Sequence, residues 1–374
     1  MQISKISSKN STFERISKAF APLTKRAYFV GGCVRDSLLG LEIKDFDIEF
    51  YDIDEKLFEK TCEKLGAQGF GKSFFVYKLN EFDLSLARRE NKIAKGHKGF
   101  EVFICNDEKE AAKRRDFTIN SMMVNIFSGE FLDLYGGKKD LKARILRHID
   151  EKSFKEDSLR VLRAVQFVAR FRLKIAPETL TLMKSIEIDD LSKDRINGEL
   201  YKFFNAKYLT LGFRALQDLN LEERIFFFNA KKDNKKNQSF QRLLNKALKF
   251  IKDEGLFLYL YLNFFNIDKK EFFKKTGLKK ELLTKAKQEF HQGKMSSLTL
   301  LKISLIMPLN QWLGLYSKAR IERAKKLHIF NQKFECKIST QKLIKKGFKG
   351  KALGDEINLL KLEALKKYLA KKAF

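Results

Sequence analysis

The chain has 374 residues, 44% of them hydrophobic, so it is long enough for more than one domain and too apolar to be intrinsically disordered. Its 76 basic residues face 47 acidic ones, which gives a formal net charge of +29. Such a surplus repels itself unless a polyanion binds, so the composition favours a nucleic-acid partner. A lysine-rich proteome is the alternative source of the charge, but the excess of basic over acidic residues favours the polyanion.

The beginning of the chain and its apolar runs argue against secretion or membrane insertion. Residues 1–20 are polar and lack the apolar centre of a signal peptide, and no apolar run reaches membrane-spanning length. The four cysteines form no C-x-x-C pair, and the four histidines form no close pair typical of a metal site. We therefore expect a cytoplasmic protein with reduced cysteines.

The first third of the chain alternates strand-like and helical patterns. Residues 1–24 indicate a short helix and a lead-in, and residues 54–66 have helical spacing. Strand-like runs occupy residues 26–32, 45–53, 74–79, 82–87, 100–105 and 121–127. These patterns predict a mixed α/β domain.

After about residue 150 nearly every segment has helical spacing. The polar stretch 229–238 is predicted to be a loop, and 240–330 alternates Leu and Phe with Lys at helical intervals. The segment 344–374 begins with a glycine-punctuated turn and ends in a basic amphipathic helix. The predicted fold class is therefore α+β, with a mixed α/β head followed by an all-helical body.

A glycine pair, Gly31-Gly32, precedes a strand-like segment on which Asp45 and Asp47 stand two residues apart. Side chains two apart on a strand point the same way, so the carboxylates repel unless a cation lies between them. Such ligands suit Mg²⁺ with substrate phosphates, and glycines let a phosphate approach the backbone closely. Arg35 is placed to contact a triphosphate. The alternative is a solvated strand edge, because D-x-D by itself is a common chance pattern.

A third carboxylate is expected from a neighbouring strand. Asp83 lies in the alternating apolar run 82–87 and is the candidate. Glu49 follows Asp47 on the same strand face, and we interpret it as structural.

Five motifs in this order resemble the class II tRNA nucleotidyltransferases, the family of CCA-adding enzymes and bacterial poly(A) polymerases. They are GGCVRDSLLGLEIKDFDIEF, KRRDFTINSMMVN, FLDLYGGKKDLKARILRHI, EDSLRVLRAVQFVARF and DLSKDRINGELYKFF. The resemblance runs from Tyr28 to Leu200 and is weak beyond, apart from glycines near the end. It implies a nucleotidyltransferase head with a polymerase-beta-like palm sheet, followed by an all-helical neck, body and tail.

The resemblance also implies a reaction, in which the 3′-hydroxyl of tRNA attacks CTP or ATP and releases pyrophosphate. Asp45 and Asp47 would bind two Mg²⁺ ions and, with Asp83, are the expected catalytic carboxylates. The residues expected to hold the nucleotide are Gly31, Gly32, Arg35, Arg115, Asp116, Asn120, Asp157, Arg160 and Arg163. Arg114 is interpreted as a solvated charge. The expected partners are tRNA, CTP and ATP, with no DNA and no membrane.

A helix starting near Ser153 is predicted to read the incoming base. Ser153 and Glu156 have the spacing of a capping box, which explains Glu156 structurally. Asp157, Arg160 and Arg163 then fall on one broad helix face. By resemblance this face selects C and A, because a carboxylate accepts from their amino group and a guanidinium donates to their ring nitrogen. The alternative is a solvated salt bridge worth at most about 0.5 kcal/mol.

Three further segments refine the resemblance. Gln166 stands where the family often has another arginine, which predicts a weaker phosphate grip or a substitute cation. Residues 70–79 resemble the CCA-adding form and lack the consecutive basic pair of the poly(A) polymerases. Residues 87–102 resemble the mobile loop that the family uses to switch from C to A, with His97 as a loop residue.

The predicted domains are a lead-in at 1–24, a nucleotidyltransferase head at 25–150, a nucleotide-reading neck at 151–205, an RNA-binding helical body at 206–330 and a basic tail at 331–374. Complete CCA addition is the expected activity. Addition of only CC or only A, poly(A) synthesis, and RNA binding without catalysis are the alternatives. The presence of Asp45, Asp47 and Asp83 argues against the non-catalytic alternative.

Overall fold

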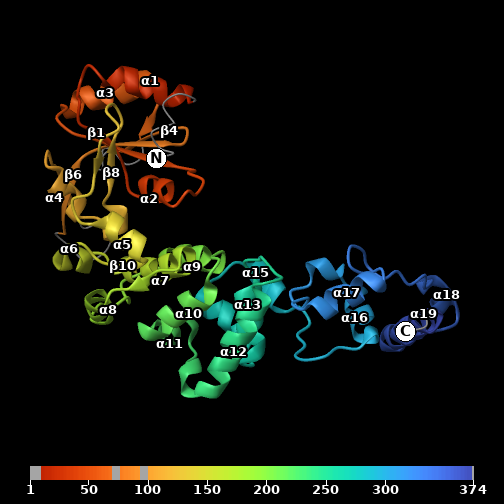
Figure 1. The fold of residues 1–374 in the computed structure, drawn as a ribbon. Helices are drawn as coiled ribbons and strands as arrows, with labels where there is room; N and C mark the ends of the chain where they lie inside the picture. Colours follow the sequence, from red (N-terminus) through yellow and green to blue (C-terminus); the bar gives the residue numbers. More distant parts are fainter. Residues whose placement is uncertain (1–9, 70–75, 93–99, 373–374) are drawn as a thin grey trace. The chain divides into compact units, whose positions relative to one another are not determined.

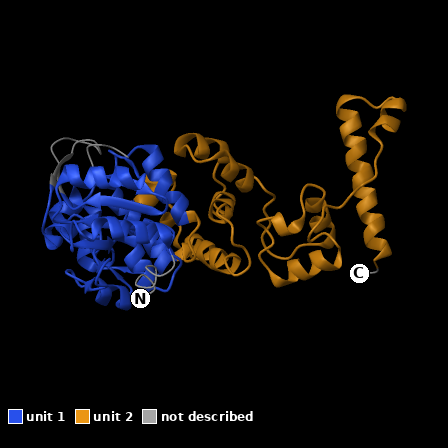
Figure 2. Cartoon of the chain, turned by 90° about the horizontal axis from the view of Figure 1, so that it is seen from above, with its two compact units in different colours: residues 1–203, 211–220 blue, residues 204–210, 221–374 orange. Residues whose placement is uncertain are grey.

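The computed structural model describes residues 10–69, 76–92 and 100–372, and the chain forms two compact units (Figure 2). Unit 1 consists of residues 1–203 and 211–220, and unit 2 of residues 204–210 and 221–374. In the described part of the chain, no helix combines the length and the apolar character needed to cross a bilayer. The predicted mixed α/β head with a helical remainder is confirmed.

Unit 1 is built on a seven-stranded sheet (Figure 1). In sheet order its strands are β3 (Gln68–Gly69), β4 (Val76–Leu79), β5 (Phe82–Leu86), β2 (Phe46–Phe50), β1 (Ala27–Val30), β8 (Met123–Asn125) and β9 (Phe131–Leu132). The central pair β2 and β5 is parallel, and the other neighbours are antiparallel. The sheet therefore places segments on either side of β2 that are distant in sequence.

Apolar and acidic residues alternate along β2, so the two faces of the strand have different roles. Phe46, Ile48 and Phe50 are buried. The ring of Phe50 lies 4.1 Å from Phe20 of α1 (Ser11–Phe20) and 5.5 Å from Phe58 of α3 (Glu55–Leu65), measured between centroids. These two helices cover the apolar face, so the acids at the intervening positions point to the other side of the sheet.

The remaining elements of unit 1 begin with α2, which follows β1 directly and contacts β1, β2 and the 3₁₀ helix η3. These elements are α2 (Gly32–Leu38), α4 (Glu108–Lys113), η3 (Thr118–Asn120), α5 (Gly137–Ala143), β10 (Ile145–Leu146), α6 (Glu151–Lys155), α7 (Leu159–Phe171), β11 (Lys174–Ile175), α8 (Pro177–Lys184) and α9 (Lys193–Phe204). Strands β10 and β11 form a short parallel pair. Helix α10 (Leu209–Asp218) returns most of its residues to unit 1.

The predicted capping box at Ser153 and Glu156 is wrong. Asp150 caps α6 instead, because its carboxylate accepts a hydrogen bond from the backbone N–H of Ser153 at 2.8 Å. Helix α6 ends at Lys155 with Glu156 as its C-terminal cap, and α7 begins only at Leu159. The predicted continuous helix is therefore two helices, and Asp157 lies between them rather than on the face of α7.

The segment expected to be a loop at 87–102 is partly strand. Strand β6 (Arg88–Lys92) pairs antiparallel with β7 (Phe100–Ile104) in a separate two-stranded sheet. His97 and the rest of residues 93–99 lie outside the described residues, as do residues 70–75 of the segment compared with the poly(A) polymerases.

Helices are the only regular secondary structure in the described residues of unit 2. Its helices are α11 (Leu221–Phe226), η4 (Ala230–Lys232), α12 (Asn234–Ala247), α13 (Leu256–Phe264), α14 (Lys269–Thr276), α15 (Lys280–Ala286), α16 (Ser297–Ser304), η5 (Leu309–Gln311), α17 (Lys318–Lys326), α18 (Thr340–Lys345) and α19 (Gly350–Lys371). Part of its core is aromatic, with Phe240 and Tyr261 5.6 Å apart and Tyr261 and Phe265 5.2 Å apart. A second cluster surrounds Trp312.

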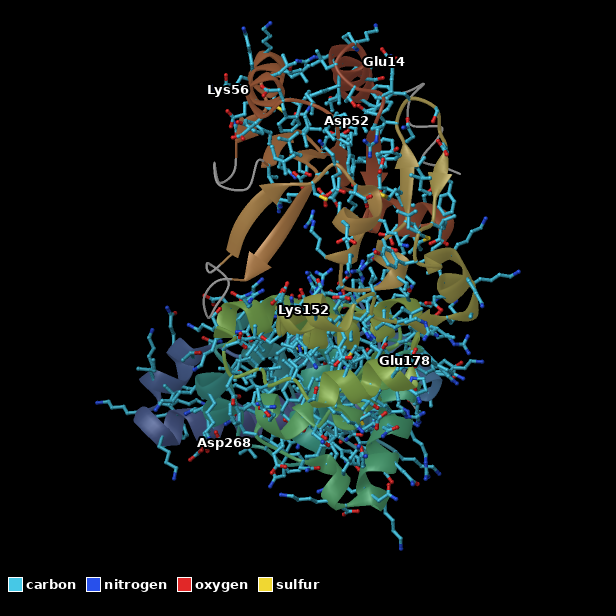
Figure 3. The ribbon with its side chains drawn as sticks, turned by 90° about the vertical axis from the view of Figure 1, so that its left-hand side faces the viewer. Glu14, Asp52, Lys56, Lys152, Glu178 and Asp268 are labelled. Atoms are coloured by element: carbon cyan, nitrogen blue, oxygen red, sulfur yellow. The ribbon has the colours of Figure 1, made fainter. Side chains whose placement is uncertain are left out.

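The loop predicted at 229–238 is wrong, because η4 occupies Ala230–Lys232 and α12 begins at Asn234. Asp233 accepts a hydrogen bond from the backbone N–H of Lys236 at 2.9 Å and thereby caps α12, which starts at Asn234. This polar, lysine-rich stretch is helical because Asp233 is a good cap for α12 and because Phe240 is buried on one side of that helix. Charged side chains such as Lys56, Lys152 and Asp268 are exposed on the outside of the chain (Figure 3). The finer boundaries predicted within the two units stay predictions.

Candidate active site

The sheet brings two of the predicted acids side by side. Asp47 on β2 and Asp83 on β5 are direct partners in the parallel strand pair. Neighbouring strands lie about 4.8 Å apart, so their side chains share one face. Asp45 lies just ahead of β2, and 72% of its side chain is exposed.

Lys78 on β4 is a member of this group that the sequence did not indicate. It is the antiparallel partner of Asp83, and its Nζ lies 3.0 Å from Asp83 Oδ1 and 3.9 Å from Asp45 Oδ1. The hydrogen bond to Asp83 raises the pKa of Lys78. The sequence could have indicated Lys78 only through its position opposite Asp83. That position can be recognised only once the register of β4 and β5 is known.

The chemistry of these acids fits a divalent metal ion. Their donors are carboxylate oxygens, which hard cations such as Mg²⁺ prefer. Desolvation by the surrounding protein raises the pKa of Asp47; Arg115 opposes this, and Asp83 and Asp45 reinforce it. Like charges of this kind are relieved by a cation between them. Within the described residues no group of three or more acidic, histidine or cysteine side chains is placed to hold a metal ion by itself.

Glu49, the third acid of the strand, is buried and structural, as interpreted from the sequence. Its carboxylate accepts hydrogen bonds from Arg114 at 2.9 Å, Arg115 at 3.2 Å and Tyr51 at 3.0 Å. Burial opposes its ionisation, but the two arginines outweigh burial and lower the pKa of Glu49. The interpretation of Arg114 as a solvated charge is therefore wrong, because its side chain neutralises a buried carboxylate.

A cavity of about 450 Å³ opens beside Asp47. It is lined by Gly31, Gly32, Arg35, Asp47, Arg115, Asp116, Asn120, Asp157, Leu159, Arg160, Arg163, Gln166, Phe167, Arg170 and Lys202. All nine residues expected to hold the nucleotide are among these, whereas Asp45 and Asp83 are not. The cavity extends from the sheet to helices α7 and α9, within unit 1.

Gly31 gives the cavity its approach to the sheet. Its φ of +72° belongs to the region that favours glycine, and a Cβ there would lie 3.2 Å from Arg115 Nη1 and 3.6 Å from Asp47 Oδ2. Any larger residue would fill the space between these two side chains.

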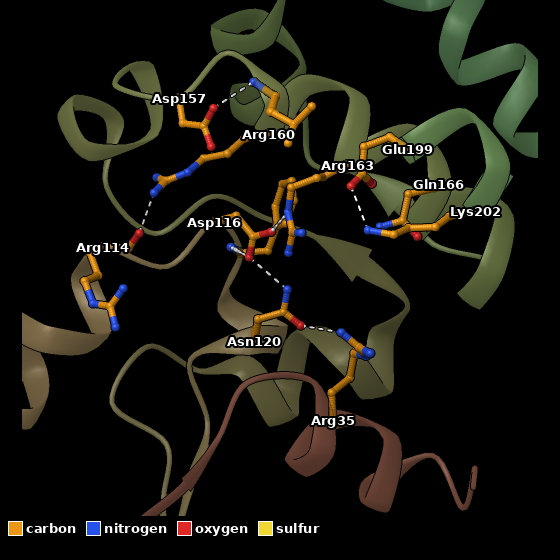
Figure 4. Close-up of polar contacts among 12 residues, drawn as sticks. Arg35, Arg114, Asp116, Asn120, Asp157, Arg160, Arg163, Gln166, Glu199 and Lys202 are labelled. Carbon is orange, nitrogen blue, oxygen red and sulfur yellow. Dashed lines mark hydrogen bonds and ion pairs between the residues drawn. The ribbon is translucent and has the colours of Figure 1, made fainter. Parts of the chain in front are cut away.

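A chain of polar contacts centred on Asp116 crosses the cavity wall (Figure 4). Asn120 accepts from Arg35 at 2.6 Å and donates to Asp116 at 2.8 Å. The second carboxylate oxygen of Asp116 accepts from Arg163 at 2.7 Å. Burial opposes the ionisation of Asp116, but Arg163, Asn120 and Arg160 prevail and lower its pKa. The helix after β1, the 3₁₀ helix and α7 are thus held together.

The two predicted base readers are fixed separately rather than to each other. Arg160 donates to the backbone carbonyl of Ser153 at 2.9 Å and to that of Arg114. Asp157 Oδ1 accepts from Arg195 of α9 at 2.9 Å, and among the described residues its hydrogen bonds go to Oδ1 only. Asp157 Oδ2 and the guanidinium hydrogens of Arg160 that do not contact these carbonyls are therefore available to a ligand. Sequence reasoning missed Arg195, whose role depends on two distant helices meeting.

The sheet, the adjacent acids and the polar cavity lie largely in the part of the chain that matches a known family. Residues 27–147 match the family described as the poly A polymerase head domain, and the predicted resemblance to the tRNA nucleotidyltransferase and poly(A) polymerase family is confirmed.

Curated proteins that are similar to this chain are named multifunctional CCA proteins or CCA-adding enzymes. The chain is 44% identical over 208 residues to the multifunctional CCA protein of Nitrosomonas europaea, covering 54% of this chain and 49% of that protein. It is 36% identical over 234 residues to the CCA-adding enzyme of Coxiella burnetii, covering 59% of this chain and 60% of that protein. The chain spans about half the length of the curated relatives that it matches.

Solved structures share the fold over nearly the whole chain. The Bacillus stearothermophilus CCA-adding enzyme in complex with CTP has a TM-score of 0.69 at 20% identity, covering 96% of this chain and 94% of that one. The Thermotoga maritima CCA-adding enzyme complexed with tRNA has a TM-score of 0.64 at 23% identity, covering 99% and 98%. These similarities extend the shared fold beyond the head into the helical part.

Proposed function

We propose that this protein adds C, C and A to the 3′ end of tRNA, using CTP and ATP and releasing pyrophosphate. The observation that carries the proposal is one cavity that has Asp47 at the sheet and Asp157 with Arg160 at the other side. The names of the relatives, CCA-adding enzymes and multifunctional CCA proteins, support the same activity. With tRNA as substrate, we place the reaction in the cytoplasm.

The chemistry begins at the acids of the sheet. Divalent ions held by Asp45 and Asp47, two Mg²⁺ in this proposal, would supply a lowered pKa at the attacking 3′-hydroxyl and neutralise charge on the leaving pyrophosphate. Asp83 is the proposed third carboxylate, held beside Asp47 by the strand pair. The bond that forms joins the 3′-oxygen to the α-phosphorus, and the bond that breaks releases pyrophosphate.

The residues of the cavity hold and orient the nucleotide. Gly31 and Gly32 leave room for phosphate oxygens beside Asp47, and Arg35, Arg115 and Arg163 supply positive charge. Asp116 and Asn120 fix two of these arginines by direct hydrogen bonds. Positioning of this kind leaves little reorganisation for the reaction itself.

Selection of the base falls to Asp157 and Arg160. A carboxylate oxygen accepts a hydrogen bond from the amino group that cytosine and adenine share, and a guanidinium donates to their unprotonated ring nitrogen. Uracil and guanine present a carbonyl and a ring N–H at those places, which would leave buried groups unpaired. The contacts that fix Asp157 to Arg195 and Arg160 to two carbonyls support a rigid template.

One experiment separates the proposed activity from its alternatives. The full chain is incubated with tRNA lacking its 3′ CCA, with CTP and ATP supplied singly and together. We expect two C residues from CTP, and one further A when both are present. Extension that stops after CC, or addition of A only to tRNA ending in CC, would identify a partial enzyme. Long A tails on unrelated RNA would identify a poly(A) polymerase, and no addition would leave RNA binding without catalysis.

A further inference from the structure

The cavity beside Asp47 carries more positive than negative side chains. Six basic residues and three acidic residues line it. Four of the basic residues have a carboxylate partner: Arg35 pairs with Asp36, Arg115 with Glu49, Arg163 with Asp116 and Lys202 with Glu199. Arg160 is fixed by backbone carbonyls. Most of this positive charge is therefore already compensated within the protein.

Arg170 is different, because its hydrogen-bond partner is a neutral side chain. Its Nη1 donates to Gln166 Oε1 at 3.2 Å, and its guanidinium lies 4.8 Å from the ring centre of Phe171. Among the described residues no carboxylate lies within ion-pair distance of Arg170. The side chain is exposed at the cavity, where it can meet an anion.

The surroundings of Arg170 disfavour its charge in the free protein. Arg35 lies against the same aromatic ring, with its guanidinium 4.5 Å from the ring centre of Phe171. Desolvation first, and then repulsion by Arg35, lower the pKa of Arg170. An anion between these two guanidiniums would relieve that repulsion.

Gln166 fixes the position of Arg170. The two residues are four apart on α7 and so lie on one face of the helix, and Gln166 is 1% exposed. An arginine at 166, which the family often has, would bring its charge from one helical turn earlier. In this chain the amide at 166 instead supports the guanidinium at 170. Arg170 is therefore the candidate for the substitute cation, which was one of the two outcomes expected from the sequence.

We propose that Arg170, oriented by Gln166, binds the polyphosphate of the incoming nucleoside triphosphate. The inference rests on the proposed function and deepens it. Arg35, the neighbour of Arg170, lies against the glycine pair: a Cβ on Gly32 would be 3.5 Å from Arg35 Nη2. The anion site therefore lies near the glycines that border Asp47, at the end where the phosphates react, rather than at the base.

The test measures equilibrium binding of CTP, ATP and cytidine to the full chain by calorimetry, for wild type and Arg170→Gln. Loss of a charge-assisted hydrogen bond should weaken CTP and ATP by about tenfold each, because polyphosphate recognition is independent of the base. Binding of cytidine should stay unchanged. Arg170→Lys keeps the charge and should lose about threefold or less.

Two further variants make the test specific. Lys184→Gln removes one positive charge from the exposed surface of α8 and should leave all three affinities unchanged. Gln166→Arg in the Arg170→Gln background should restore CTP affinity to within about threefold of wild type, because it returns the charge to the same helix face. Thermal melting of each variant confirms that it is folded.

The outcomes separate this inference from the proposed function. Unchanged CTP binding in Arg170→Gln, or an equal loss for cytidine, would overturn the inference. A loss of affinity for tRNA with CTP unaffected would assign Arg170 to an RNA phosphate and overturn it as well. If CTP binding depends on Arg170 but the chain adds nothing to tRNA, the inference holds and the proposed activity fails.

Discussion

At the scale of single residues, Asp116 is the carboxylate that joins the opposite walls of the cavity. It accepts from Asn120, Arg163 and the backbone N–H of Phe117, and it is buried. Removing one partner of a buried ion pair leaves the other charge uncompensated, which costs far more than losing a surface pair. The residue is therefore expected to stabilise the fold as well as position Arg163.

We predict that Asp116→Asn lowers the free energy of unfolding by about 3 kcal/mol at pH 7. The folded pKa of Asp116 is lowered, so its contribution is present above the ordinary aspartate pKa of about 3.9 and is lost as pH falls through the folded value. Urea unfolding of both proteins between pH 7 and pH 3 would show the difference shrinking at the acidic end. A difference that is constant with pH would contradict the ionised role.

Asp47 gives a prediction about catalysis. Asp47→Ala should abolish incorporation of both C and A while affinity for tRNA is retained, because the proposed role of the acid is to hold the metal rather than to contact the RNA body. Primer extension and filter binding would measure the two properties, with Glu14→Ala on the exposed side of α1 as control. Turnover of the variant in Mg²⁺ would rule out the metal role.

The template can be tested at Arg160 and at the residue that supports its partner. Arg160→Ala should let UTP or GTP compete with CTP, and Arg195→Leu should reduce discrimination by about tenfold because Asp157 loses a charge-assisted hydrogen bond. Competition between CTP and UTP in single-nucleotide addition gives the ratio directly. Unchanged selectivity in both variants would show that the template lies elsewhere.

At the scale of elements, the short 3₁₀ helix that carries Asn120 depends on close packing against α5. A Cβ on Gly137, the first residue of α5, would lie 2.1 Å from the backbone oxygen of Thr118. In contrast, no heavy atom lies within 4 Å of a Cβ placed on Gly198 in the middle of α9. Close packing therefore requires glycine at 137, whereas nothing in the packing requires it at 198.

We predict that Gly137→Ala destabilises the protein by about 3 kcal/mol, since backbone must move against backbone. Gly198→Ala should stabilise it by about 0.8 kcal/mol, the difference in helix propensity. Thermal unfolding of the pair gives both signs. An unaltered melting temperature for Gly137→Ala would mean that α5 shifts without cost.

The elements also show what the sequence could and could not predict. Alternation of polar and apolar residues, strict over 45–50 and 82–86, was enough to find β2 and β5 and to propose that Asp47 and Asp83 cooperate. The break before α7 was missed because Asp150 and Ser153 are both good cap residues. The structure uses Asp150, which lies earlier in the chain, so a separate helix α6 forms ahead of α7. Lys78 and Arg195 were missed because their contacts depend on strand register and on helix packing, which a pattern along the chain does not contain.

At the scale of the whole molecule, the net charge of +29 predicts strongly salt-dependent binding to RNA. Each phosphate contact releases a counterion, so several contacts should reduce affinity for tRNA at least about tenfold between 50 and 200 mM salt. Filter binding at a series of KCl concentrations would give the slope. A flat response would contradict a polyanion as the reason for the charge.

The chain passes between the two units more than once, since unit 1 regains residues 211–220 after 204–210 have joined unit 2. In the regained segment Phe213 and Leu216 are fully buried, and a Cβ on Gly212 would be 2.7 Å from that of Ala169. A gene truncated at codon 205 would encode every side chain of the cavity but would lack residues 211–220. The resulting fragment would expose the apolar surface that residues 211–220 cover and would aggregate. A stop codon therefore belongs after 220.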